Sequence, residues 1–266
     1  MKKQTIHSLF ALKAKREPIT MLTAYDATFA KLICEQGVET ILIGDSLGNV
    51  IQGQGSTVPV TMSDMCYHIS CVAKGNEGAL LIGDMPYMSY ASEEQTLSNA
   101  AKLMQAGANM VKMEGGLWLV GSIQRLVERG IPVCAHLGLT PQSVDALGGY
   151  KVQGRDQQQA EQLLEDAIAL EQSGASLLVL ECVPQELAKQ VSEKLTIPTI
   201  GIGAGKYTDG QVLVLHDMLG LDQDFNPKFV RNFMLGDNVR SVADAIASYV
   251  ESVKNKTFPA AEHCFD

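Results

Sequence analysis

The hydrophobic pattern of this chain alternates between short apolar runs and longer amphipathic segments. The short runs are rich in Val, Ile and Leu, as in parallel strands that are buried on both faces. They predict eight strands, at about residues 19–24, 40–44, 79–83, 109–113, 131–135, 176–180, 197–202 and 211–215. Apolar positions at helical spacing lie between most of them and after the last, near 26–36, 62–74, 92–106, 117–129, 157–173, 184–195, 226–235 and 239–254.

A glycine recurs between the end of a predicted helix and the start of the next strand. Gly37, Gly107, Gly130 and Gly174 each occupy this place. Glycine fits the residue after a helix, because the backbone there often adopts a positive φ. Four copies of helix, glycine and strand indicate a repeating βα unit.

Eight such units favour a (βα)8 TIM barrel over an open doubly wound sheet. Polar residues follow strands two to six, whereas an open sheet would place its site mainly at one switch point. Before the first strand, Ile6, Leu9 and Phe10 share helical spacing and predict an N-terminal helix that closes the barrel floor. The 266 residues suit a single barrel domain over 1–266, since roughly 250 residues is typical.

Composition narrows the possible partners and location. The formal charge of -9 and the pI near 5.1 argue against binding to nucleic acid or to an anionic membrane surface. The sequence contains no run of about 18 apolar residues, so it predicts no membrane-spanning helix. The six cysteines form no CxxC pair, which is typical of free thiols in a reducing cytoplasm.

Five acidic or imidazole side chains each follow directly on an apolar run: Asp45, Asp84, Glu114, His136 and Glu181. In α/β folds this end of the strand carries the chemistry. A buried carboxylate is costly unless it is paired, hydrogen-bonded or bound to a metal, so the set predicts one site that holds a cation. Asp45, Asp84 and Glu114 are hard oxygen donors, which suit Mg²⁺. Zinc would prefer His and Cys ligands, and the sequence has no such cluster. For any one acid, the alternative is a helix N-cap.

Three side chains have open roles in this site. Lys112 lies two residues before Glu114, so both can face the barrel interior. It could be a Schiff-base amine, a carboxylate anchor or a counter-ion, and nearby acids should keep it charged, which favours the substrate carboxylate. Glu181 ends an apolar strand, a setting that raises a carboxyl pKa toward the range of a general base; a helix cap is the alternative. His136 is either structural or part of the site.

Two long connections and one glycine-rich turn complete the candidate features. Residues 45–61 and 137–156 are longer than most loops, which predicts covers over the site rather than idle surface loops. The turn 201–205 (GIGAG) follows strand seven and could hold a phosphate or let the backbone approach a planar ligand.

Longer strings along the chain resemble the ketopantoate hydroxymethyltransferase family. They include 44–48 (GDSLG), 107–112 (GANMVK), 136–142 (HLGLTPQ), 148–155 (GGYKVQGR) and 208–214 (TDGQVLV). The match runs in order from about residue 5 to residue 263, and no departure occurs at the candidate site positions.

This resemblance implies a magnesium-dependent barrel related to the phosphoenolpyruvate/pyruvate superfamily. It implies transfer of a one-carbon hydroxymethyl unit from 5,10-methylenetetrahydrofolate to 3-methyl-2-oxobutanoate, through a magnesium-stabilised enolate. The product would be 2-dehydropantoate, in pantothenate and coenzyme A biosynthesis. Members of the family are typically cytoplasmic homodecamers, built as pentamers of dimers.

The resemblance also implies residue roles. Asp45 and Asp84 would hold Mg²⁺ and thereby the substrate, with Glu114 assisting. Ser46 and Lys112 would bind the ketoacid. Glu181 would accept the proton, and His136 would contact the ketoacid or the folate side. Lys151 and Arg155 are candidates for the glutamate tail of the folate.

Two other functions stay open at this point. One is a related magnesium-dependent C–C lyase or mutase that acts on 2-oxo acids. The other is a metal-stabilised structural or sensor barrel without catalytic activity.

Overall fold

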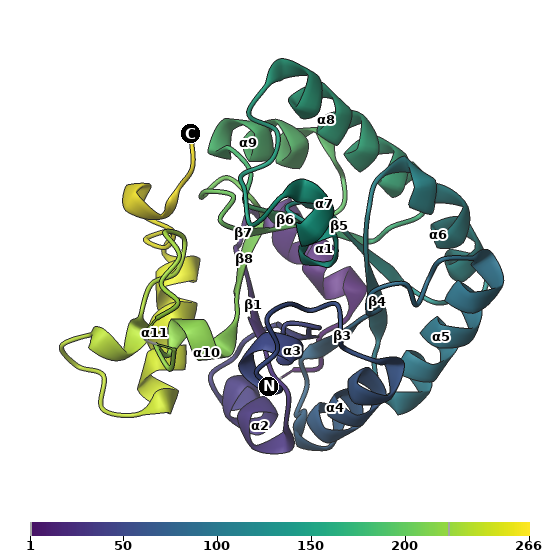
Figure 1. Cartoon of the computed structure of the whole chain (residues 1–266). Helices are drawn as coiled ribbons and strands as arrows, with labels where there is room; N and C mark the ends of the chain where they lie inside the picture. Colours follow the sequence, from purple (N-terminus) through teal and green to yellow (C-terminus); the bar gives the residue numbers. More distant parts are fainter. Residues whose placement is uncertain (1, 223) are drawn as a thin grey trace.

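Eight parallel strands close into a barrel in the computed structural model, which describes residues 2–222 and 224–266 (Figure 1). The strands are β1 (Ile19–Thr23), β2 (Thr40–Ile43), β3 (Leu80–Asp84), β4 (Met110–Glu114), β5 (Val133–Gly138), β6 (Leu177–Glu181), β7 (Thr199–Ile202) and β8 (Gly210–Leu213). Each pairs with the next in sequence, and β8 pairs with β1. The predicted barrel is therefore confirmed, strand for strand.

Helices surround the barrel (Figure 1). The longer ones are α2 (Ala27–Glu35), α4 (Met62–Gly75), α5 (Glu93–Ala106), α6 (Val120–Val127), α8 (Gln157–Gln172), α9 (Gln185–Lys194) and α11 (Val242–Lys254). Short turns of helix lie in the connections: α3 (Leu47–Val50), α7 (Val144–Leu147), α10 (Leu215–Met218), η1 (Leu117–Leu119), η2 (Pro141–Ser143), η3 (Phe233–Leu235) and η4 (Ala261–His263). No helix of the described residues is long and apolar enough to cross a membrane.

Short-range sequence signals set the ends of these helices. Asp26 caps α2 by accepting hydrogen bonds from the N–H groups of Thr28 and Phe29. Gly107 follows the C-terminal end of α5 and has φ +124°. A Cβ at this position would lie 2.6 Å from the side chain of Ala73 on α4. Glycine at this position therefore satisfies both the backbone turn and the packing of adjacent helices.

Two sequence predictions need correction. The helix predicted over 226–235 is wrong, because only η3 is helical there. Pro227 accepts a bond from the N–H of Val230 in an isolated turn, and the Asn232 side chain accepts from the N–H of Met234, so local polar groups compete with helix formation. Strand five runs to Gly138 rather than to 135, which places His136 within β5.

The N-terminal helix α1 (Ile6–Lys15) closes the floor of the barrel, as predicted. Its Leu9 is buried among inward-facing residues of the strands, including Ile19, Met21 and Leu80. An apolar plug at this end leaves the opposite rim as the open mouth of the barrel.

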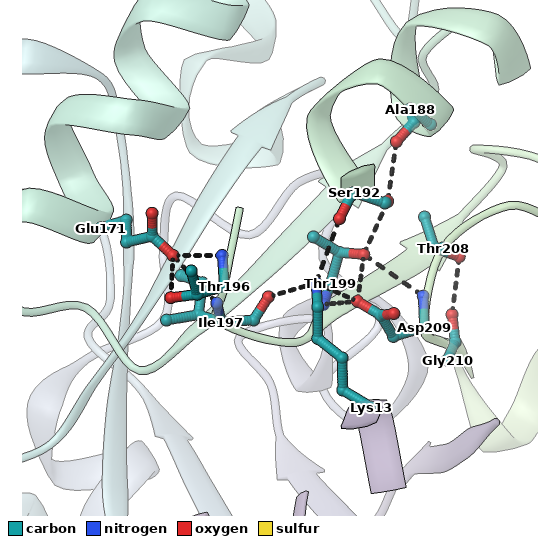
Figure 2. Close-up of polar contacts among 10 residues, drawn as sticks. All are labelled: Lys13, Glu171, Ala188, Ser192, Thr196, Ile197, Thr199, Thr208, Asp209 and Gly210. Atoms are coloured by element: carbon teal, nitrogen blue, oxygen red, sulfur yellow. Dashed lines mark hydrogen bonds and ion pairs between the residues drawn. The ribbon is translucent and has the colours of Figure 1, made fainter. Parts of the chain in front are cut away.

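Polar contacts fix α1 in place (Figure 2). Lys13 Nζ donates to the carbonyl oxygens of Ser192 and Ile197, at 3.1 and 2.8 Å, and to Asp209 Oδ2 at 2.8 Å. The same Asp209 oxygen accepts from the N–H and the hydroxyl of Thr199. One lysine thus ties the floor helix to α9, to the entry of β7 and to the turn before β8.

Replacing Lys13 with methionine should remove these bonds while keeping most of the side-chain packing. We expect Lys13→Met to lower the free energy of unfolding by about 2 kcal/mol, because a carboxylate and two carbonyls lose a charged donor. Urea denaturation measures the change. Lys15→Met, at an exposed position of the same helix, is the matched control. Equal stability of the two variants would contradict the assigned role of Lys13.

Candidate active site

A cavity of about 840 Å³ lies at the C-terminal ends of the strands. Its walls include residues that directly follow or end several strands, together with parts of both long connections. Asn49 and Gln54 come from the 45–61 segment, and Tyr150 and Lys151 come from the 137–156 segment. Both predicted cover segments therefore border the same cavity. Their closure during a reaction stays a prediction.

Three buried carboxylates and one lysine meet at the tips of β2, β3 and β4. Lys112 Nζ lies 2.7 Å from Asp84 Oδ1 and 3.5 Å from Glu114 Oε1. The backbone N–H of Asp45 donates to Asp84 Oδ2 at 3.1 Å. Asp45, Asp84, Lys112 and Glu114 are each at most 4 % exposed. The sequence prediction that Lys112 and Glu114 share an inward face is confirmed.

Gln142, which was not among the residues predicted from the sequence, joins this group. Its side-chain amide donates to Asp45 Oδ2 at 2.8 Å and to the carbonyl oxygen of Met85 at 2.9 Å. Its backbone N–H donates to Glu114 Oε2 at 3.1 Å, and its side-chain oxygen accepts from the hydroxyl of Tyr90 at 2.5 Å. The only sequence signal was its place at the end of the 136–142 string, within a long connection.

His136 lies between two carboxylates. Its Nδ1 is 3.4 Å from Glu114 Oε1, and its Nε2 is 3.3 Å from Glu181 Oε2. Burial and the ammonium group of Lys112 lower the pKa of His136, but the two carboxylates outweigh them and raise it to about 9. At neutral pH the imidazolium is therefore the cation that faces Glu181.

The chain turns sharply just after Glu181. Cys182 has φ 47°, a left-handed conformation that is costly for a residue with a Cβ. The carbonyl oxygen of Cys182 accepts from the N–H of Gln153 at 2.9 Å. This bond connects the tip of β6 to the 137–156 segment and fixes the backbone beside Glu181.

The cluster of acids strongly perturbs the pKa values of its members. Burial, followed by the carboxylates of Asp84 and Glu114, raises the pKa of Asp45 well above its usual range. Burial would also raise the pKa of Glu114, but Lys112, His136 and the N–H of Gln142 lower it on balance. Burial alone would lower the pKa of Lys112, but the surrounding carboxylates outweigh burial and raise it well above its usual value. This lysine therefore stays charged, as predicted.

The formal charges of this half of the cavity leave room for a divalent cation. Asp45, Asp84, Glu114 and Glu181 carry four negative charges when ionised, against two positive charges on Lys112 and protonated His136. Among residues 2–222 and 224–266, no three His, Cys, Asp or Glu side chains are grouped as ligands of one ion. Magnesium does not require such a group, because one or two carboxylates with waters and substrate oxygens suffice. Asp45 and Asp84 are hydrogen-bonded neighbours and fit that requirement.

The remaining sequence candidates divide between the cavity and the surface. Ser46 lines the cavity, and its hydroxyl is 2.9 Å from the hydroxyl of the buried Tyr25. Lys151 also lines it, whereas Arg155 is exposed elsewhere. In the glycine-rich turn, Gly203 and Gly205 have positive φ values, and a Cβ on Gly205 would lie 2.4 Å from Gln185 Cβ. Close packing within the chain therefore accounts for glycine at that position.

Two carboxylates of the cavity lining, Asp217 and the exposed Asp222, lie apart from the charged cluster. Asp217, on α10, is mostly buried and lines the side formed by β8. Burial raises its pKa to about 7, with a contribution from the carboxylate of Asp222, and no hydrogen bond contributes to the shift.

The family model that describes ketopantoate hydroxymethyltransferase matches residues 3–261. The chain belongs to this family. The 3-methyl-2-oxobutanoate hydroxymethyltransferase 2 of Pseudomonas fluorescens Pf-5 is 60% identical over 262 residues, which cover 98% of both chains. The 3-methyl-2-oxobutanoate hydroxymethyltransferase of Idiomarina loihiensis is 59% identical and covers 99% of this chain and 98% of its own.

Solved structures with distant sequences share the barrel fold of this family member. Phosphoenolpyruvate phosphomutase from Streptomyces platensis has a TM-score of 0.62 at 14% identity and covers 96% of this chain and 99% of its own. For 2,3-dimethylmalate lyase, a member of the PEP mutase/isocitrate lyase superfamily, the TM-score is 0.59 at 16% identity, covering 96% of this chain and 98% of its own. The predicted fold type is thereby confirmed.

Gln142→Leu tests the amide that holds Asp45. We expect the free energy of unfolding to fall by about 2–4 kcal/mol, because buried polar groups of Asp45, Met85 and Tyr90 each lose a partner. Gln153→Leu, in the same connection, is the control, since its side-chain amide bonds only the nearby carbonyl of Lys151. A loss no larger than that of the control in urea denaturation would show that the Gln142 amide does not hold the cluster.

Asp217→Asn should stabilise the protein at alkaline pH. The folded-state pKa of about 7 lies above the ordinary value of 3.8, so ionisation of Asp217 disfavours the folded state. This cost is absent below about pH 4, grows as the pH rises to about 7, and then stays at about 2–4 kcal/mol. Urea denaturation at pH 5 and pH 8 should therefore show a larger gain at pH 8. Asp224→Asn, at an exposed position, should show none, and an equal gain at both pH values would refute the burial cost.

Proposed function

We propose that this chain is a 3-methyl-2-oxobutanoate hydroxymethyltransferase that uses 5,10-methylenetetrahydrofolate as the one-carbon donor. The reaction would consume one water and release 2-dehydropantoate and tetrahydrofolate. The observation that carries the proposal is the convergence of Asp45, Asp84, Lys112, Glu114 and Glu181 on one cavity in a member of this family.

The charged side of the cavity would bind the ketoacid. Lys112 supplies a buried ammonium group for the substrate carboxylate, and Ser46 supplies a hydroxyl donor. Asp45 and Asp84 would hold Mg²⁺, with Glu114 assisting, and the bound ion would stabilise the charge that develops on the keto oxygen. These roles match the excess of negative charge on this side.

Glu181 would act as the general base. It lines the cavity, and its Oε2 lies 3.3 Å from Nε2 of His136. Glu181 would take the proton from C3 of the ketoacid, the carbon beside the ketone, and leave an enolate. Such a positioned base contributes typically 10²–10⁴-fold to the rate. His136 would hold Glu181 in place and also contact the bound substrate.

The enolate carbon would then bond to the methylene carbon carried by the folate. That carbon is held by N5 and N10 of the folate: one C–N bond breaks as the C–C bond forms, and the other breaks as the oxygen of water becomes the new hydroxyl group. The proton taken from C3 and one proton of the water end on the two freed nitrogens, which gives tetrahydrofolate. Exclusion of bulk water by the two cover segments would protect the reactive carbon until the donor is in place.

Two broader properties are part of the proposal by family resemblance. One is assembly into a homodecamer, and the other is a cytoplasmic location. The six cysteines are free thiols, as is typical of proteins in reducing compartments.

Glu181→Gln tests the proposed base without involving the folate. With 3-methyl-2-oxobutanoate and Mg²⁺ in D₂O, the wild-type protein should exchange the C3 hydrogen, and the variant should do so about 10²–10⁴-fold more slowly. NMR follows the exchange. Magnesium-dependent binding of the ketoacid, measured by calorimetry, should persist because the amide occupies the same space.

Glu186→Gln is the matched control, because Glu186 is exposed on α9 close to the same strand. Exchange at the wild-type rate in Glu181→Gln would refute the assignment of the base. Magnesium-dependent cleavage of isocitrate or 2-methylcitrate by the wild-type protein, without transfer from methylenetetrahydrofolate, would instead support the lyase alternative.

A further inference from the structure

The cavity is divided into a charged side and an apolar side. All members of the charged cluster come from β2 to β6 and the residues that follow them. The opposite arc carries Ile202 of β7 and Val212 of β8, with Val214, Phe229 and Phe265 beside them. A flat ring with little charge is the ligand type that such an arc accommodates.

The size of the cavity also points to a second ligand. Its volume of about 840 Å³ lies near the upper end of the roughly 300–1,000 Å³ typical of sites for drug-sized molecules. A five-carbon ketoacid on the charged side fills only a small part of that space. Tyr150, Leu221 and Phe225, which also line the cavity, are 57, 61 and 48 % exposed. Exposed apolar side chains gathered at one opening mark a binding surface.

Three polar side chains that follow β8 line the cavity: His216, Asp217 and Asp222. No described residue donates a hydrogen bond to the carboxyl group of Asp217. Asp222 differs, because it is exposed and its carboxylate accepts the N–H of Asp224 at 3.0 Å. The Asp217 carboxylate has no donor within the described chain, so a ligand that supplies N–H groups would form hydrogen bonds that the chain itself does not provide.

We propose that Asp217 anchors the pterin ring of the folate co-substrate by accepting hydrogen bonds from its N3–H and its 2-amino group. These two donors lie side by side on one edge of the ring, and a carboxylate accepts both in a bidentate pair. The ring then lies against the apolar arc, with the ketoacid on the charged side, so the two reacting carbons face each other. This inference rests on the proposed function and adds to it a residue that selects the donor.

Asp217→Asn tests the anchor, because it keeps the shape and removes the second acceptor and the charge. We expect the KM for methylenetetrahydrofolate and the Kd for tetrahydrofolate to rise by about 10- to 100-fold. Deuterium exchange at C3 of the ketoacid, which needs no folate, should stay within about twofold of the wild-type rate. Asp224→Asn, in the neighbouring connection and outside the cavity lining, should change none of these values.

A folate analogue separates anchoring from a merely structural effect. A tetrahydrofolate whose 2-amino group is replaced by methyl should bind the wild-type protein about tenfold more weakly than tetrahydrofolate. In the Asp217→Asn variant, by contrast, the analogue and tetrahydrofolate should bind with nearly the same affinity. The proposal would be overturned if Asp217→Asn bound tetrahydrofolate as tightly as the wild-type protein does. It would also be overturned if the substitution weakened the binding of tetrahydrofolate and of the analogue by the same factor. Failure of the proposed function is seen separately, as wild-type protein that gives neither exchange nor transfer.

Discussion

The balance of charge around the ammonium group of Lys112 is the constraint on which the candidate site depends. Lys112 is buried with Asp84 at 2.7 Å and Glu114 at 3.5 Å, and Asp45 lies next to Asp84. Lys112 and protonated His136 cannot neutralise the four carboxylates of the site, and burial makes the remaining negative charge costly. The site therefore favours bound cations and protons, and in the proposed function it would draw Mg²⁺ and a substrate carboxylate into the same small volume.

The closed barrel makes this concentration of charge possible. Adjacent strands are in register, so Asp84 pairs with Lys112 and Glu114 pairs with His136 across neighbouring strands. The polar residue at each tip is carried by an apolar strand that is packed on both faces. The favourable burial of these strands and of the floor helix α1 offsets the cost of the charged rim. Stability at one end of the barrel thus supports an unfavourable arrangement at the other.

Much of this could be predicted from the sequence, because it is encoded by neighbours along the chain. Apolar runs ended by acids gave the strands and most of the charged cluster, and glycines marked the helix ends. Gln142 was missed because its contacts with Asp45 and Glu114 span 97 and 28 positions and follow no periodic pattern. Asp217 was missed because a single acid after an apolar strand has the same local pattern as a helix cap. The helix predicted over 226–235 was wrong because local turns at Pro227 and Asn232 compete with the helix that the apolar spacing predicts.

The two kinds of acid in the cavity are unfavourable for different reasons, and this difference suits two substrates. The cluster around Lys112 combines mutual repulsion with burial, which a divalent ion relieves. Asp217 is affected mainly by burial, which a neutral ligand with N–H donors relieves. In the proposed function, a cation with an anionic ketoacid and a flat donor ring would therefore satisfy separate requirements of one cavity. Each ligand then has a preferred side, and neither competes for the other's partners.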